Sequence, residues 1–169
     1  KTSTVELALG GLGTNQNYTT PINAIMTDVP RVPGGSSSGS GVALANNLCA
    51  ASFGTDTGGS VRIPAAWNRL VGLKTSIGRV SVNGVLELAS SYDTVGPLTK
   101  SVKDASILFS ILSNTPYIKF EKLNYNNIKL IYVQGMPIDG CDDEVLKYIN
   151  HSINKLSSAG IKIIEKKVY

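Results

Sequence analysis

The stretch from 34 to 60 opens with GGSSSGSG at 34–41 and closes with DTGGS at 56–60. Glycine is needed where the backbone bends sharply or comes close to a ligand. Serine supplies a hydroxyl that can attack, relay a proton or bind. Two glycine–serine clusters around a segment of small apolar residues therefore predict a site built from backbone N–H groups and serine oxygens.

The composition indicates a protein with a real core and no compartment signal. The 169 residues suffice for one ordinary domain or most of one, and 42% of them are apolar. No run approaches the roughly 18 apolar residues of a membrane span. No basic start followed by an apolar run indicates a signal peptide. We therefore expect a cytoplasmic protein without a membrane partner.

Charge and cysteine usage argue against further classes. The net charge is +4, but basic and acidic residues alternate after residue 100, whereas a nucleic-acid surface needs a concentrated basic patch. Cys49 and Cys141 each stand alone, which argues against a zinc or redox site. Cys49 lies among Ala and Leu, as is typical of a small buried hydrophobe. We expect no direct nucleic-acid partner, no cofactor and no metal.

Hydrophobic periodicity and turn residues predict an α/β fold. Residues 10–41 are expected to be largely irregular, after a strand end or short helix in 1–9. The later elements are a buried helix at 42–51, a strand at 51–55, a short helix at 60–69 interrupted near Pro64, short apolar or β-rich pieces at 70–74, 79–82 and 85–88, a helix at 101–112, a surface loop at 113–127, a strand at 128–133, a helix from 142 to Gly160, and a strand at 161–168. The last strand–helix–strand unit implies a parallel pair with a right-handed crossover.

Two predicted helices carry clear end signals and apolar faces. Ser101 and Asp104 resemble a capping box at the start of the first. Gly160 is a natural end for the second. The residues expected to face inward are Val102, Ala105, Leu108, Phe109 and Leu112 on the first helix, and Val145, Ile149, Ile153 and Leu156 on the second.

The glycine–serine clusters allow several chemistries. A phosphate-binding loop needs Lys and then Ser or Thr after its last glycine, but Val42 follows Gly41. A flexible linker is disfavoured because an apolar segment follows at once. Ser60 follows backbone N–H groups that could converge as an oxyanion hole, yet a serine needs a base. The one histidine, His151, falls on a predicted surface helix. A serine–lysine pair is a known variant, and Lys74 is the least exposed lysine by pattern.

Four segments resemble the amidase signature family: RVPGGSSSGS at 31–40, GTDTGGSVRIPAA at 54–66, VGLKT and GRVS at 71–81, and LASSYDTVGPLT at 88–99. The resemblance runs from Lys1 to about Leu112. It implies a mixed β-sheet core flanked by helices, with residues 1–169 forming part of a single amidase domain. The signature core would be 1–112 and the strand–helix–strand unit 128–168.

The resemblance also implies a Ser–cis-Ser–Lys triad that hydrolyses or transfers amide groups. Ser60 would be the acylated nucleophile, and Ser36, joined to Gly35 by a cis peptide bond, would relay the proton. The oxyanion-hole N–H groups would come from Ser60 itself and from Thr57, Gly58 and Gly59. Asp56 and Arg62 would form a supporting ion pair behind the nucleophile.

One feature departs from the family pattern. The family's triad lysine lies upstream of the position that matches Lys1, so the resemblance assigns no base within this chain. We therefore expect an internal fragment, truncated at both ends and inactive alone.

Three functions stay open. The leading one is hydrolysis of a small-molecule amide. The second is the glutaminase-type component of a tRNA-dependent amidotransferase, which works with partner subunits. Arg62-Ile63-Pro64 and 86–88 favour the first, because these amidotransferase components usually carry Gln after that Arg. The third is a non-catalytic, truncated amidase-like protein. The amide's identity and a homodimer are left open by the sequence.

Overall fold

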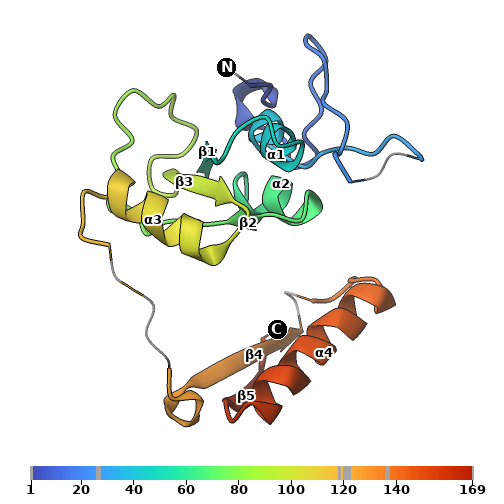
Figure 1. The fold of residues 1–169 in the computed structure, drawn as a ribbon. Helices are drawn as coiled ribbons and strands as arrows, with labels where there is room; N and C mark the ends of the chain where they lie inside the picture. The colour runs from blue at the N-terminus through green and yellow to red at the C-terminus, as the bar shows by residue number, and fades with distance from the viewer. Residues whose placement is uncertain (1, 26–27, 118, 120–122, 136–137, 169) are drawn as a thin grey trace. The chain divides into compact units, whose positions relative to one another are not determined.

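The computed structural model describes residues 2–25, 28–117, 119, 123–135 and 138–168. The chain divides into two compact units, Lys1–Lys119 and Phe120–Tyr169. Figure 1 shows the helices and strands that make up each unit.

The first unit is built around a three-stranded antiparallel sheet. Its elements are η1 (Glu6–Ala8), α1 (Ser38–Ala45), β1 (Ser52–Asp56), α2 (Arg62–Trp67), β2 (Val71–Gly72), β3 (Thr94–Thr99) and α3 (Val102–Leu112). The strand order is β1-β3-β2, so β3 is central. The β1–β3 register pairs Ser52 with Leu98 and Asp56 with Thr94.

The second unit is a strand–helix–strand element. It comprises η2 (Tyr125–Asn127), β4 (Lys129–Gly135), α4 (Asp143–Ser158) and β5 (Lys162–Val168). β4 and β5 are parallel and pair from Lys129–Lys162 to Gly135–Val168. The predicted α/β class and parallel pair are confirmed.

The core of the first unit lies where α1, α2 and β3 meet. Leu44, Val61, Ala65 and Leu98 form its buried cluster, and the partly buried Cys49 packs against it. The core therefore joins the segment after the first glycine–serine cluster to the segment after the second.

The predicted helix at 42–51 is misplaced. α1 begins at Ser38, so serines and glycines of the first cluster make its first turn. It ends at Ala45 because Asn47 adopts a left-handed conformation with φ 62°, a conformation that terminates helices. Leu48, expected to be buried, is 77% exposed.

The prediction of an interruption at Pro64 is also wrong. Pro64 is the third residue of a continuous α2. N–H groups in the first turn have no partner inside a helix, so proline costs little there. The segments 79–82 and 85–88 form no strands.

The sequence reading missed β3, the central strand. Proline is rare in central strands because it lacks an N–H donor, and β3 contains Pro97. In the structure the Pro97 carbonyl accepts from Leu73 N at 3.1 Å. That carbonyl faces β2, which has only two residues, so few ladder bonds are lost on that side.

The helix-end signals are confirmed. The Ser101 hydroxyl accepts from Asp104 N at 3.1 Å at the start of α3. Gly160 follows α4 with φ 98°. The expected inward faces are only partly right, because Ala105 is 3% exposed whereas Val102 is 63% and Val145 46% exposed.

Candidate active site

A backbone hydrogen bond brings the two glycine–serine clusters together. Ser37 N donates to the Ser60 carbonyl at 3.2 Å. The Ser37 hydroxyl donates to the Thr55 carbonyl at 3.4 Å. A Cβ added to Gly54 would clash with Ser37 Oγ, so glycine is required for this approach.

Ser36 lies in a firmly held loop. Its peptide bond with Gly35 is cis, as the resemblance implies. The Ser36 carbonyl accepts from Val5 N at 3.1 Å and from the Thr4 hydroxyl at 2.9 Å. Ser36 is 1% exposed. The N-terminal segment therefore fixes the position of this serine.

The loop from Thr57 to Ser60 presents free backbone donors. Within the described residues, no acceptor is found for the backbone N–H groups of these four residues. Gly59 has φ 145°, and a Cβ there would meet Ile63 Cδ1 at 2.8 Å. Such unpaired N–H groups in one loop can bind an oxyanion.

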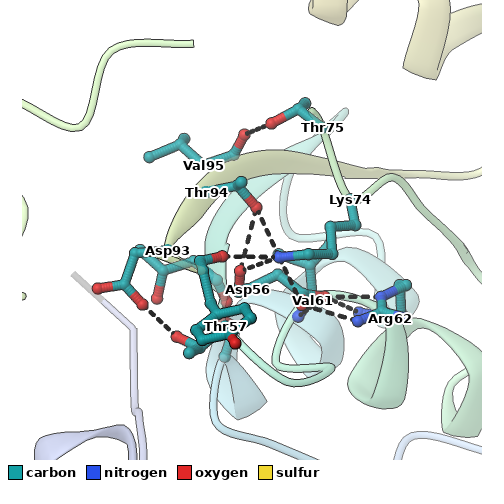
Figure 2. Close-up of polar contacts among 12 residues, drawn as sticks. Asp56, Thr57, Val61, Arg62, Lys74, Thr75, Asp93, Thr94 and Val95 are labelled. Atoms are coloured by element: carbon teal, nitrogen blue, oxygen red, sulfur yellow. Dashed lines mark hydrogen bonds and ion pairs between the residues drawn. The ribbon is translucent and has the colours of Figure 1, made fainter. Parts of the chain in front are cut away.

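Asp56 anchors this loop from β1 (Figure 2). Its side chain is fully buried, and Arg62 contacts it with Nε at 3.0 Å and NH2 at 3.0 Å. Val61 N and Arg62 N also donate to it, at 3.2 and 3.3 Å. Burial alone would raise the pKa of Asp56, but these bonds and the Arg62 charge hold that pKa below its usual value. The predicted supporting pair is thus present, with a carboxylate that is charged at neutral pH.

Asp93 anchors the same loop from the residue before β3. Its carboxylate accepts from the Thr57 hydroxyl and from Leu88 N and Ala89 N at 2.9 and 2.8 Å. The hydrogen bond from Thr57 is the main cause that lowers the pKa of Asp93. Sequence reasoning missed Asp93 as a site residue, although it stood inside the segment at 88–99.

Lys74 is the second residue that sequence reasoning did not assign. Its Nζ donates to the Asp56 carbonyl at 2.5 Å, to the Tyr92 carbonyl at 2.9 Å and to Thr94 Oγ1 at 3.2 Å. It also lies 3.4 Å from the Asp56 carboxylate. The apolar pattern around Lys74 indicated its partial burial, but not these partners.

The structure brings together most of the predicted site residues. Asp56, Thr57, Gly58, Gly59, Ser60 and Arg62 are consecutive or directly bonded, and Ser36 adjoins them through Ser37. No hydrogen bond joins the Ser36 and Ser60 hydroxyls among the described residues. His151 is exposed in the second unit. Lys1 lies outside the described residues.

Metal ligands and membrane-spanning helices do not feature in the described structure. In the part of the chain that it covers, no group of three or more His, Cys, Asp or Glu side chains is placed to hold a metal ion. Among the described helices, none is both long and apolar enough to cross a membrane.

Comparison with known proteins identifies the family. The amidase family model matches residues 1–169. The 2-amino-5-chloromuconic acid deaminase of Comamonas testosteroni is 38% identical over 97% of this chain and 36% of its own length. The glutaminase-type component of the glutamyl-tRNA(Gln) amidotransferase of Campylobacter hominis is 40% identical over 98% of this chain and 39% of its own length.

Solved structures agree with this result. A crystal structure of an amidase superposes with a TM-score of 0.86 and 39% identity, over 97% of this chain and 37% of the amidase. The chain thus spans little more than a third of the relatives that it matches. Because the family model covers the chain from end to end, this chain belongs to the amidase family.

Proposed function

We propose that this chain is part of a longer amidase that hydrolyses a small amide through an acyl-enzyme on Ser60. The observation that carries the proposal is the Thr57–Ser60 loop, whose free N–H groups adjoin Ser36 through the Ser37–Ser60 bond. The family membership supports hydrolysis of a C–N bond.

The reaction begins with transfer of the Ser60 hydroxyl proton to Ser36, which passes its own proton to a neutral lysine. Ser60 Oγ then attacks the amide carbonyl carbon. The carbonyl oxygen becomes an oxyanion that the N–H groups of the loop stabilise. The C–N bond breaks as the proton returns to the nitrogen, and water then hydrolyses the ester on Ser60.

In this proposal the lysine base lies outside the chain, and Lys74 does not replace it. Three acceptors use all three hydrogens of the Lys74 ammonium, and an ammonium has no lone pair to accept a proton. The chain alone should therefore be inactive.

The test is labelling of the complete protein with a fluorophosphonate. We expect labelling that disappears in Ser60→Ala. The control is Ser91→Ala, since Ser91 is exposed and should label like wild type. Labelling that persists in Ser60→Ala would disprove the assignment of the nucleophile. An unlabelled wild type would favour a non-catalytic protein. Amide hydrolysis by the isolated 169-residue chain, abolished by Ser60→Ala, would contradict the missing base.

The second candidate is the glutaminase-type component of an amidotransferase, which the 40% identity to such a protein supports. Ile63 favours the hydrolase, because an apolar side chain there borders Gly59 in the loop. Glutamine-dependent activity that needs partner subunits would decide for the amidotransferase. Hydrolysis of simple amides by the complete protein alone would decide for the hydrolase.

A further inference from the structure

Lys74 is a charged residue within the site network to which the proposed reaction gives no task. Its side chain is 26% exposed. The ammonium contacts two backbone carbonyls, one hydroxyl and one carboxylate, and it donates all its hydrogens to them. Desolvating a lysine is costly unless its hydrogen bonds are satisfied, so this arrangement requires a reason.

The contacts of Lys74 join the ends of three strands (Figure 2). Lys74 follows β2 by two residues, Asp56 ends β1 and Thr94 begins β3. The Asp56 carbonyl accepts from Lys74 Nζ at 2.5 Å and from Thr94 Oγ1 at 3.0 Å. One peptide group at the end of β1 is thus held by both neighbouring segments.

This peptide group determines the direction of an oxyanion donor. In a trans peptide the C=O and the following N–H point in opposite directions within one rigid plane. The Asp56–Thr57 bond is not among the cis bonds of the described residues. Because Lys74 and Thr94 hold the Asp56 carbonyl, they also hold the Thr57 N–H, which points away from them.

Lys74 also acts on the buried carboxylate of the same residue. Arg62 supplies the first cation to Asp56 from a position that is 48% exposed. The Lys74 ammonium at 3.4 Å is the second cation. Asp56 in turn accepts from Val61 N and Arg62 N, directly after Ser60. Lys74 is therefore connected to both ends of the Thr57–Ser60 loop.

We propose, building on the function proposed above, that Lys74 is a positioning residue that orients the Thr57 N–H toward the reaction's oxyanion. A neutral side chain of similar length would keep the packing but lose the restraint on the Asp56 carbonyl. The Thr57 N–H would then turn away for part of the time. Its loss should weaken the transition state more than the initial complex, because the oxyanion develops only during the reaction.

The experiment measures fluorophosphonate labelling kinetics of the complete protein. The reaction forms the Ser60 Oγ–P bond, breaks the P–F bond and releases fluoride with the serine proton. For Lys74→Met we expect a fall in the maximal inactivation rate of roughly 10- to 100-fold, somewhat below the loss from deleting an oxyanion donor. The probe's binding constant and the final labelled fraction should stay at wild-type values. A merely structural role would instead lower the labelled fraction and leave the rate of the folded molecules unchanged.

Matched variants complete the test. Lys103→Met removes an exposed lysine of α3 and should label at the wild-type rate. Lys74→Arg, which keeps the charge, should recover part of the loss. If Lys74→Met does not fold, Thr94→Val tests the same restraint, because it removes the other side-chain donor to the Asp56 carbonyl. We expect its rate to fall about two- to tenfold, the effect of one hydrogen bond.

The outcomes separate this inference from the proposed function. Ser60-dependent labelling of wild type, with wild-type rates in Lys74→Met or in Thr94→Val, overturns the role of Lys74 and leaves the nucleophile in place. Labelling that does not depend on Ser60 overturns the proposed function itself.

Discussion

Residues 1–119 and 120–169 enclose their apolar side chains to very different degrees. Leu44, Val61 and Leu98 in the first unit are 0% exposed, whereas Ile161, at 7%, is the one buried apolar residue among those described in the second. The groove along α4 and its strands leaves Ile131 55% and Tyr148 64% exposed. The two units therefore derive their structure from different sources.

Long-range contacts hold the first unit. Its polar bonds join residues far apart in sequence, such as Asn68 with Pro33 and Thr94 with Asp56. Local signals define the second unit: acidic residues begin α4, glycine follows it and the apolar periodicity selects one face. This difference shows that the loop carrying the candidate nucleophile depends on contacts that no local pattern specifies.

The largest expected effect on stability comes from cutting the core of the first unit. Leu98→Ala should lower the free energy of unfolding of residues 1–119 by about 3–4 kcal/mol, because it leaves a cavity at a fully enclosed site. The matched change Ile153→Ala, at a half-buried position, should cost the second unit only about 1–2 kcal/mol. Hydrogen exchange resolved by segment in the complete protein measures both values. Equal losses would contradict the difference in packing.

The next effect comes from the buried carboxylate. Asp56→Asn keeps the shape but removes the charge that Arg62 and Lys74 face. We expect a loss of about 2–3 kcal/mol, below the usual cost of breaking a buried pair because Arg62 is half exposed. The same change at Asp143, exposed in the first turn of α4, should cost about 0.3–1 kcal/mol. Urea denaturation checks both, and comparable losses would show that Asp56 is no anchor.

Acid should weaken the first unit through Asp56 and Asp93, whose pKa values are lowered in the folded state. Each carboxylate contributes stability above the unfolded pKa of about 3.9, and this contribution is lost as the pH falls through the folded pKa. The stability of wild type should therefore approach that of Asp56→Asn as the pH falls from about 6 to about 3. Urea midpoints measured across this range provide the test. A constant difference would show that the Asp56 charge is not the source of the stability.

The sequence predicted best what depends on neighbouring residues. The Ser101 cap and the strand–helix–strand unit at 128–168 follow from local patterns and are confirmed. β3 was missed because Pro97 argues against a central strand unless one knows that β2 is short. Lys74 and Asp93 were not assigned because their partners lie 18 and 36 residues away. The family resemblance, rather than periodicity, identified the segments that the structure brings together.

The smallest expected effect tests whether the second unit relies on local signals alone. Gly160 and Gly78 both adopt left-handed conformations, with φ 98° and 77°, but a Cβ at Gly160 would lie 2.5 Å from Asn126 Oδ1 whereas one at Gly78 meets nothing within 4 Å. The backbone term should make each change to alanine cost about 1 kcal/mol. Gly160→Ala should exceed Gly78→Ala by only a few tenths of that value, roughly 0.3 kcal/mol, because the end of a flexible side chain can rotate away.

Hydrogen exchange of α4, compared with that of the turn around Gly78, measures this small difference. A Gly160→Ala cost near that of Gly78→Ala would mean that backbone conformation alone ends α4, as a locally specified unit requires. A much larger cost would mean that Asn126 holds the end of α4 through a contact 34 residues distant in sequence. The second unit would then share the long-range dependence of the first, and the two would differ only in how completely their apolar faces are covered.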